Sequence, residues 1–243
     1  MSIPKSHPRY ESLRTRDLIV KGVEGGVTSV HGLIAHGRGE AFDYLIGEKT
    51  NEFADKASEA AAAMLLNARH PVISVNGNAA ALVPRELAGL SKLLNAPLEV
   101  NIFHPSKQRE AKIKEHLERY GAKNGLLPDK KFKIEFLGSN RRFVNPDGIY
   151  KADIVFVPME DGDRTEALIR NGKKVITVDL NPLSRTAQKA TITIVDDIIR
   201  AMPLLIKTIK QYKKYDKKRL DSMIKKYNNR KILDEAIKQI RKS

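Results

Sequence analysis

The chain of 243 residues has no cysteine, which excludes a disulfide framework, a zinc site with thiolate ligands and a cysteine nucleophile. No apolar stretch approaches the ~20 residues that a transmembrane helix needs. The first residues, MSIPKSHPRYESL, lack the apolar segment of a secretion signal. From these absences we predict a cytoplasmic protein that does not enter a membrane.

Common nucleotide-binding and catalytic motifs are also missing. The sequence contains no G-x-x-x-x-G-K-[ST] motif, which excludes a P-loop nucleoside triphosphatase. The nearest approach to the dinucleotide motif G-x-G-x-x-G is residues 37–42, which follow a helical pattern and lack the third glycine. Neither H-E-x-x-H nor G-x-S-x-G occurs, so we expect no histidine zinc site and no serine nucleophile of that type. Any nucleotide must therefore be bound by other means.

The positive charge is uneven along the chain. The formal net charge is +15, and residues 207–243 carry 14 Lys or Arg against four Asp or Glu, which leaves +10 on this segment. Its apolar residues recur at helical spacing. We interpret the charge as the solvated face of basic helices and expect no specific nucleic-acid partner. Contact with RNA or an anionic surface is the alternative, because charge alone supplies such binding.

Six short segments predict strands. They are rich in β-branched residues, and several are apolar almost throughout, which is typical of strands buried on both faces of a parallel sheet. The predicted strands are residues 71–76, 98–103, 132–137, 153–158, 175–179 and 191–195. Residues 123–149 are the least regular part of the chain, with turn signals and a basic cluster, and fit a strand between mobile loops.

Helical patterns alternate with these strands. Thr50 can cap a helix, Pro84 and Pro105 suit a first helical turn, and a helix that begins near Asp161 ends at Gly172. The alternation predicts an α/β fold, namely a Rossmann-like, doubly wound, mostly parallel sheet with helical N-terminal and C-terminal segments. We predict a single domain over residues 1–243, with a helical segment 1–70, a core 71–200 and a basic helical segment 201–243.

Ligands of such a sheet bind beyond the carboxyl ends of its strands. Polar residues follow several of the predicted strands, and the first candidates for substrate contacts come from the first two. These candidates are Asn76, Asn78 and His104, together with Arg109 shortly afterwards. The sequence therefore predicts a ligand site along this edge of the sheet.

Three carboxylates follow the fourth predicted strand, at Glu160, Asp161 and Asp163. They can help to hold Mg²⁺, because this ion needs few protein ligands when phosphates supply the others. A plain loop and helix start, with Gly162 among them, accounts for the same residues. We therefore assign no metal ligand to the protein from the sequence.

The sequence DLNPLSRTA, residues 179–187, has more hydrogen-bonding groups than a connecting turn needs. Asp179, at a strand end, is placed like the acids that accept hydrogen bonds from ribose hydroxyls. Ser184 or Thr186 can cap a short helical turn, and Arg185 offers planar donors to phosphate. We predict a nucleotide contact in this elbow, which is our name for residues 179–187. A well-capped connection between a strand and a helix remains the alternative.

Arg38 is the single arginine of residues 32–50 and lies between Gly37 and Gly39. Glycines on both sides allow a ligand to approach closely, so this arginine is a candidate anion clamp. An exposed arginine at a joint between helices is the alternative. Arg16, in the sequence RTRD, fits the charged face of an N-terminal helix.

Longer stretches are far more specific than these short motifs. They are IPKSHPRY, GLIAHGRGEAFDYLIGEKT, PVISVNGNAAAL, VPMEDGDRTEALIRNGKKVITVDLNPLSRTA and ITIVDDIIRA. Together they resemble the archaeal phosphopantothenate synthetases, which are 4-phosphopantoate–β-alanine ligases. The likeness runs through residues 3–203 and weakens around residues 105–150. The C-terminal segment after residue 203 has no distinctive likeness to the family.

The resemblance implies a homodimer that condenses 4-phosphopantoate with β-alanine, using ATP and Mg²⁺, in coenzyme A biosynthesis. It implies ATP contacts at Arg16, Arg38, Asp179, Leu180, Asn181, Arg185, Thr186, Asp197 and Ile198. The family often has asparagine where this sequence has Asp197. At that position the resemblance supports a backbone contact but not one from a side-chain amide.

For such a ligase we infer an acyl adenylate, formed when the carboxylate of 4-phosphopantoate attacks the α-phosphate of ATP. Arg38 is our candidate for stabilising the charge at that phosphate. Another nucleotide-dependent transferase or a kinase on this fold is the first alternative. An RNA-binding protein that uses the basic tail is the second.

Overall fold

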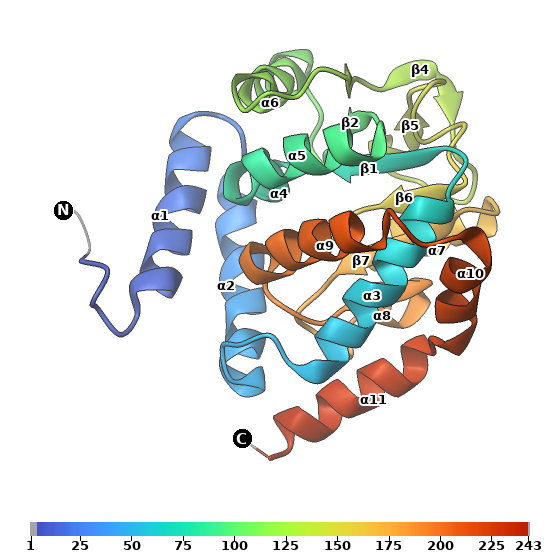
Figure 1. The fold of residues 1–243 in the computed structure, drawn as a ribbon. Coiled ribbons are helices and arrows are strands. Elements are labelled where there is room, and N and C mark those ends of the chain that lie inside the picture. Colours follow the sequence, from blue (N-terminus) through green and yellow to red (C-terminus); the bar gives the residue numbers. More distant parts are fainter. Residues whose placement is uncertain (1–3, 243) are drawn as a thin grey trace.

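The computed structural model describes residues 4–242 and shows a central sheet with helices on both faces (Figure 1). The helices are α1 Tyr10–Glu24, α2 Val30–Ile46, α3 Glu52–Asn67, α4 Gly77–Leu82, α5 Pro84–Leu94, α6 Lys107–Arg119, α7 Gly162–Arg170, α8 Arg185–Lys189, α9 Ile198–Tyr212, α10 Lys217–Lys226 and α11 Asn229–Ile240, with a 3-10 turn at Asn140–Arg142. The strands are β1 Pro71–Val75, β2 Leu98–Val100, β3 Gly125–Leu126, β4 Asp129–Lys133, β5 Phe143–Val144, β6 Ile154–Phe156, β7 Lys174–Val178 and β8 Ile192–Ile194.

Six of these strands form one parallel sheet in the order β3-β2-β1-β6-β7-β8. The chain builds outward from β1 through β2 to β3, and then resumes on the other side of β1 with β6, β7 and β8. The register aligns Ile73 of β1 with Leu98 of β2 and with Phe156 of β6. This arrangement confirms the predicted doubly wound α/β fold. Its topological switch point, where such sheets bind ligands, lies between β1 and β6.

Alternating residues of the strands enter two different cores, as the two-residue period of a strand requires. Ile73 and Phe156 point into the larger core, which α3, α5 and α9 cover. Val72 and Val155 point into the smaller core on the other face, where α7 packs. Because both faces are buried, the strands are apolar almost throughout, which explains the signal in the sequence.

The predicted strand at residues 132–137 is wrong. β4 covers only its first two residues and pairs antiparallel with β5, in a two-stranded sheet apart from the main one. Ile134 and Leu137 are buried in the smaller core, while Phe136 between them is exposed and has φ +66°. This loop therefore inserts two apolar side chains three residues apart into the core, without the alternation or the pairing of a strand. The outermost parallel strand is instead the very short β3.

Two predicted helix starts are also wrong by one or two residues. Asn51 and not Thr50 occupies the N-cap of α3, and the Thr50 hydroxyl donates to Asp196 Oδ2 at 2.6 Å. Pro105 precedes α6, whose N-cap Ser106 accepts from the backbone N–H of residue 109. Pro84 in the first turn of α5 is confirmed, as is the glycine that follows α7, Gly172, with φ +75°.

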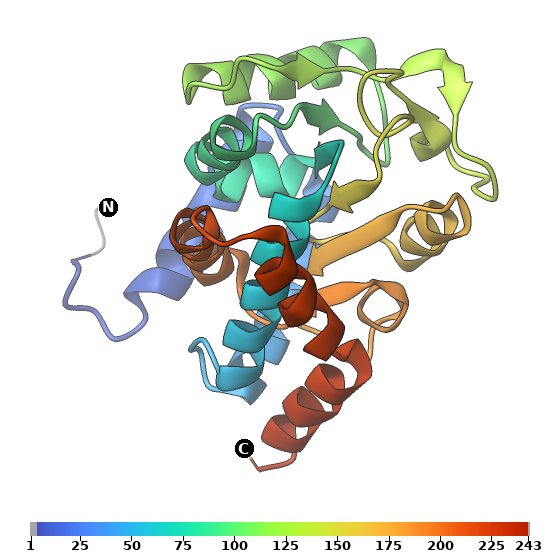
Figure 2. The same ribbon diagram turned by 45° about the vertical axis from the view of Figure 1, so that its right-hand side comes forward.

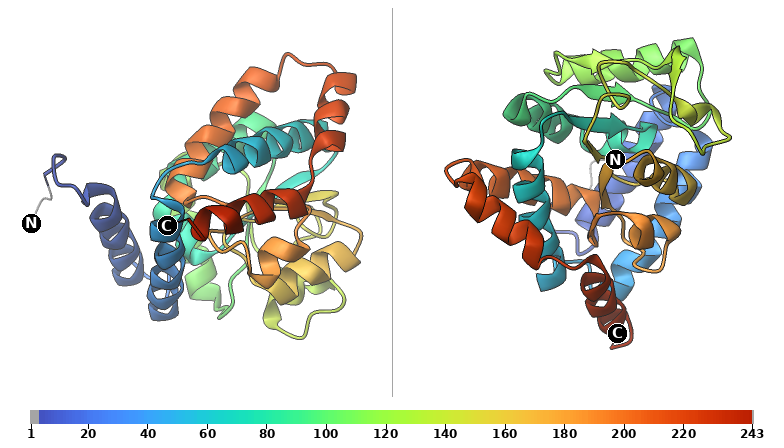
Figure 3. Two further views of the ribbon diagram at one scale, coloured as in Figure 1. Left: turned by 90° about the horizontal axis from the view of Figure 1, so that it is seen from below. Right: turned by 90° about the vertical axis from the view of Figure 1, so that its right-hand side faces the viewer.

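The basic C-terminal segment is helical, as predicted. Helices α10 and α11 follow α9 along the outside of the molecule, where they contact α3, and α11 also contacts α8 and β8 (Figure 2). At the opposite end, α1 lies outside α2 and forms the outermost layer (Figure 3). No helix within residues 4–242 combines the length and the apolar character needed to cross a bilayer.

Candidate active site

Helix α2 lies across the carboxyl ends of the strands. Near its start, Asn78 after β1 donates through Nδ2 to the Gly32 carbonyl at 2.9 Å. At its middle, a Cβ placed on Gly39 would lie 3.8 Å from Leu180, which follows β7. Near its end, Asp43 pairs with Arg200 beyond β8. One helix thus borders the whole edge at which a doubly wound sheet binds ligands.

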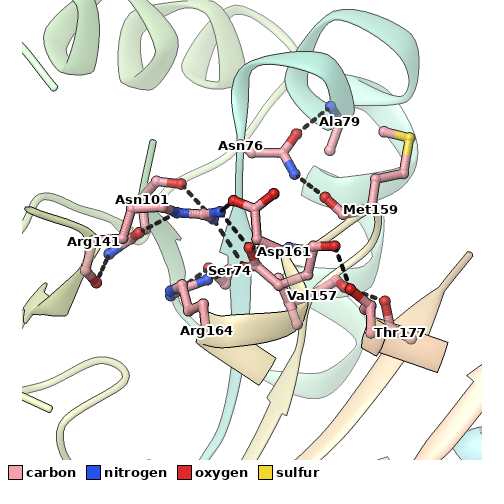
Figure 4. A network of polar contacts seen from close by, with 12 residues as sticks. Ser74, Asn76, Ala79, Asn101, Arg141, Val157, Met159, Asp161, Arg164 and Thr177 are labelled. Carbon is pink, nitrogen blue, oxygen red and sulfur yellow. Dashed lines mark hydrogen bonds and ion pairs between the residues drawn. The ribbon is translucent and has the colours of Figure 1, made fainter. Parts of the chain in front are cut away.

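At the switch point, Asn76 joins the ends of β1 and β6. Its Nδ2 donates to the carbonyls of Pro158 and Met159 at 3.1 and 2.8 Å, and its Oδ1 accepts from the Ala79 N–H at 2.9 Å (Figure 4). The neighbouring Met159 has φ +57°, which turns the chain sharply after β6. Both N–H donors of the Asn76 side chain and one lone pair of its oxygen therefore bond within the protein. They fix the ends of β1 and β6 at the base of the site.

A buried ionic network lies beside this junction. The side chain of Glu160 is inaccessible to solvent and forms ion pairs with Arg141 and Arg164. Arg141 Nη2 donates to Glu160 Oε2 at 2.9 Å, and Arg164 donates to the Ser74 hydroxyl at 3.2 Å. Burial alone would raise the pKa of Glu160, but the two guanidinium groups outweigh it and hold the pKa below its usual value. Glu160 is therefore an ionised structural anchor.

Arg141 is one of the members of this network that the sequence did not single out. Its Nε donates to Asn101 Oδ1 at 3.1 Å and its Nη2 to the Asn101 carbonyl at 3.2 Å (Figure 4). It also pairs with Asp161 at 2.7 Å, a carboxylate that is half exposed. The signal available was the pair of arginines in the irregular segment 123–149, which predicted a basic cluster but not its partners.

The three carboxylates considered for Mg²⁺ do not converge. Glu160 is enclosed by arginines, Asp161 pairs with Arg141, and Asp163 is exposed in the first turn of α7. Within the described part of the chain, no group of three or more acidic or histidine side chains is arranged to hold a metal ion. Any Mg²⁺ would thus take most of its ligands from phosphates and water.

The elbow after β7 is organised around Asp179. The Ser184 hydroxyl donates to one oxygen of its carboxylate, and the other accepts from the Asn181 N–H at 2.9 Å. Burial raises the pKa of Asp179 in spite of these bonds and the nearby positive charge of Arg38. Ser184 also accepts from the Ala187 N–H at 2.9 Å, which confirms it as the cap of α8. The loop is therefore held in one shape by its own polar groups.

The two residues after Ser184 have different surroundings. The Thr186 hydroxyl is buried and donates to the Glu160 carbonyl at 2.7 Å, which ties the elbow to the end of β6. Arg185 is largely exposed, lies against Gly162 and pairs with Glu166. Thr186 thus positions the loop, whereas Arg185 presents its guanidinium at the surface.

The two arginines predicted in the N-terminal helices are used differently. Arg16 pairs with Glu40 at 2.9 Å and donates to the Tyr44 hydroxyl at 3.1 Å, so α1 is fastened to α2. Arg38 is exposed in the middle of α2, and no hydrogen bond or ion pair joins its side chain to residues 4–242. A side chain at Gly37 would meet nothing within 4 Å. Arg38 therefore stands free beside the elbow, with open space next to it.

At the end of β8, Asp197 is the N-cap of α9 and accepts from the Ile199 N–H at 2.7 Å. Burial raises the pKa of Asp197 to about 6, and the negative charges of Asp43 and Asp196 act in the same direction. The N–H of Ile198, in the first turn, has no acceptor among the described residues. Its side chain is buried, so only its backbone can face a ligand.

The β1–β2 side of the edge holds the remaining candidates. Asn78 is engaged on both sides of its amide, by the Thr28 hydroxyl and the Gly32 carbonyl. The His104 ring lies 5.2 Å from that of His31, and its carbonyl accepts from Arg109 Nη1 at 3.4 Å. Burial lowers the pKa of Arg109. The structure therefore places Arg109 and Arg38 on opposite sides of the switch point.

A sequence profile described as Phosphopantothenate/pantothenate synthetase matches residues 53–243. The chain belongs to this family. It is 52% identical to the 4-phosphopantoate–beta-alanine ligases of Thermococcus kodakarensis and Thermococcus onnurineus, over 99% of this chain and 93% of theirs. A relative of the same name from Methanosarcina mazei is 50% identical, over 98% of this chain and 94% of its own.

Membership of the phosphopantothenate synthetase family confirms the resemblance found in the sequence. The profile match begins inside α3, so α1 and α2 with Arg16 and Arg38 lie before it. The alignments with the two Thermococcus ligases cover 99% of the chain, and so take in both helices. The helix that borders the candidate site is thus shared with those ligases.

Proposed function

We propose that the chain is an ATP-dependent ligase that condenses 4-phosphopantoate with β-alanine and releases AMP and diphosphate. The observation that carries this proposal is the match over nearly the whole chain to three proteins named 4-phosphopantoate–beta-alanine ligase. The geometry of the carboxyl edge supports it, since a shaped elbow, a free arginine and a free helical N–H group line one side of the switch point.

The nucleotide, in this proposal, lies at the ends of β7 and β8. Asp179 faces the ribose, because a carboxylate oxygen with one internal bond still has a lone pair for a hydroxyl. The N–H of Ile198 at the start of the 15-residue helix α9 suits a phosphate oxygen. Contacts from Leu180, Asn181, Arg185, Thr186, Asp197 and Arg16 complete the set that we propose for ATP.

The chemistry begins when a carboxylate oxygen of 4-phosphopantoate attacks the α-phosphorus. The new O–P bond gives an acyl adenylate, while the bond from that phosphorus to the bridging oxygen breaks and diphosphate leaves. The amine nitrogen of β-alanine then attacks the acyl carbon, AMP leaves and the nitrogen loses a proton to solvent. Arg38 stabilises the charge that develops at the α-phosphate, because its donors form no hydrogen bond with residues 4–242.

Mg²⁺, when bound, neutralises phosphate charge and orients the diphosphate leaving group. The residues present fit an ion that arrives with the nucleotide, since the described acidic side chains form no ligand cluster. Asp161 follows β6 at the switch point and keeps half of its side chain accessible to solvent while it pairs with Arg141. It is therefore the one protein group that we assign to this ion.

We further propose that two copies pair through the outer face of α1 and α2. Val30, Ile34 and Leu45 of α2 expose 62%, 70% and 41% of their surface, and Val20 of α1 exposes 44%. Exposed aliphatic residues aligned along one helix favour burial against a partner. Arg38 is one helical turn from Ile34 and lies on this same face, so the proposed pairing places it at the border of the interface. We expect Ile34→Glu to shift a dimer toward monomer in sedimentation; a wild-type monomer would contradict the pairing. We also propose that the protein acts as a single domain in the cytoplasm.

The function is tested by incubating the protein with ATP, Mg²⁺, β-alanine and 4-phosphopantoate, and then omitting each in turn. The expected products of the complete mixture are the amide, AMP and diphosphate, with none formed when any component is left out. ADP in place of AMP would indicate phosphoryl transfer by a kinase or an ADP-forming ligase. Absence of the amide from the complete mixture would reject the proposal.

A further inference from the structure

Arg109 is a half-buried arginine that no acidic group neutralises. It lies in the first turn of α6, and its side chain extends over the end of β1, where Nη2 would lie 3.0 Å from a Cβ placed on Gly77. No carboxylate of residues 4–242 forms an ion pair with it, and burial is the single cause of its lowered pKa. The guanidinium nevertheless stays protonated, because its pKa is so high in water.

The Arg109 guanidinium also lacks most of the hydrogen bonds that its N–H groups can form. The Nε atom is buried without a partner, and Nη2 donates to no described residue. Among residues 4–242, the guanidinium forms one hydrogen bond, a long one from Nη1 to the His104 carbonyl, at 3.4 Å. By contrast, Arg141 and Arg164 at the same edge each pair with a buried carboxylate. Desolvating a cation without a counter-charge is costly, so this site is arranged for an anion that comes from outside the chain.

We propose that Arg109 binds the 4-phosphate of 4-phosphopantoate and thereby sets the preference for the phosphorylated acid. This inference rests on the function proposed above. Guanidinium groups suit phosphate because their planar donors match its oxygens two at a time. Gly77 lets the guanidinium lie close to the backbone after β1, since a Cβ there would come within 3.0 Å of Arg109 Nη2 and 2.6 Å of the Val27 carbonyl.

The spacing along the sheet fits a substrate laid across the switch point. Arg109 lies above β1, whereas the elbow follows β7, two strand positions away and therefore ~10 Å distant at ~4.8 Å per strand. In 4-phosphopantoate, five bonds of about 1.5 Å each separate the carboxyl carbon from phosphorus. A phosphate on Arg109 thus leaves the carboxylate above β6, next to the α-phosphate of a nucleotide held at β7 and β8.

Asn76 and Asn78 then act as positioning residues on this side. The Asn76 amide fixes the ends of β1 and β6, and the Asn78 amide fastens the start of α2. In each residue, both the amide N–H group and the amide oxygen already bond within the protein. These two side chains therefore shape the surface between Arg109 and the proposed nucleotide site rather than bind the substrate. His104 supplies its carbonyl to Arg109 and holds the guanidinium over Gly77.

The test compares Arg109→Ala and Arg109→Lys with the control Arg119→Ala, which removes an exposed arginine three turns along the same helix. We expect Arg109→Ala to raise KM for 4-phosphopantoate about 10- to 100-fold, as for loss of a charged hydrogen-bonded partner, with KM for ATP unchanged. The ratio of kcat/KM for 4-phosphopantoate over pantoate should fall by a similar factor. Arg109→Lys should lie in between, and Arg119→Ala should match the wild type.

A rise in KM for ATP in place of that for 4-phosphopantoate would overturn the proposal and assign Arg109 to the nucleotide. Unchanged values for both substrates would overturn it too. Calorimetric binding of 4-phosphopantoate alone separates this inference from the proposed function, because it needs no turnover. Wild-type binding that is lost in Arg109→Ala would support the site even without catalysis, and equal binding in both would reject it. Melting temperatures show whether Arg109→Ala folds; if it does not, Arg109→Lys provides the same comparison.

Discussion

The centre and the flanks of the carboxyl edge use arginine in opposite ways. At the centre, Arg141 and Arg164 enclose the buried carboxylate of Glu160 and hold the ends of β1 and β6 against the loop before β5. On the flanks, Arg38 and Arg109 form no ion pair with a carboxylate of residues 4–242, although the charge of Arg38 acts on Asp179 from nearby. The difference supports our proposal that the arginines at the centre stabilise the fold, whereas those on the flanks bind anionic groups of the substrates.

The largest expected effect comes from breaking the centre. Glu160→Gln removes the ion-pair partner of the buried Arg164 and leaves Arg141 with only the half-exposed Asp161, so we expect a loss of about 3–5 kcal/mol in the free energy of unfolding. Chemical denaturation of the variant and the wild type measures this loss. The matched control is Glu166→Gln on α7, the helix that follows Glu160; its carboxylate pairs with the exposed Arg185 and should matter much less. Equal losses in both variants would contradict a structural centre.

Breaking a flank should instead reduce activity. Arg38→Ala removes an exposed side chain with no hydrogen bond, so the melting temperature should stay that of the wild type. If Arg38 stabilises charge at the α-phosphate, kcat should fall about 10²- to 10³-fold. Arg14→Ala, an exposed arginine of α1 that pairs with Glu11, is the control and should retain activity. A loss of stability in Arg38→Ala that accounts for the lost activity would show that this arginine also has a structural role.

A smaller effect concerns Asp197, an acidic group that burial disfavours. Its pKa rises to about 6 on folding from about 4, so the folded state binds the proton more tightly and loses stability as the pH rises through this window. Asp197→Asn keeps a good N-cap and should be more stable than the wild type at pH 7, by at most about 3 kcal/mol. Chemical denaturation of both proteins between pH 4 and pH 8 should show that the extra stability of Asp197→Asn over the wild type disappears near pH 4.

The control for this comparison is Asp216→Asn, at the exposed N-cap of α10. It exchanges the same two residue types in the same helical position, but without burial. A pH-dependent gain of similar size in Asp216→Asn would mean that capping chemistry and not desolvation causes the effect at Asp197.

Local signals predicted much of the fold and of the elbow. The apolar runs found β1, β6, β7 and β8 because strands buried on both faces leave an unbroken pattern. The elbow was recognisable because Asp179 and Ser184 bond to groups within five residues of them in the chain. By contrast, β3 has two residues, too few to show any period.

Long-range pairing was not readable from the sequence. Arg141 meets Glu160 only after the segment before β5 folds back over the end of β6, and nothing local to either residue records that contact. The same limit applies to the flanks. Arg109 has no carboxylate partner because none of the described acidic residues lies beside it in the fold, and the sequence alone does not show which residues lie there.

The central claim, that the carboxyl edge joins a carboxylate to the α-phosphate of ATP, is tested by following oxygen. 4-Phosphopantoate labelled with ¹⁸O in its carboxylate is incubated with ATP, Mg²⁺ and β-alanine, and the phosphorus products are analysed by mass spectrometry. An acyl adenylate transfers one labelled oxygen to AMP and none to diphosphate. Label in orthophosphate together with ADP would contradict this mechanism, because it would mean attack at the γ-phosphate.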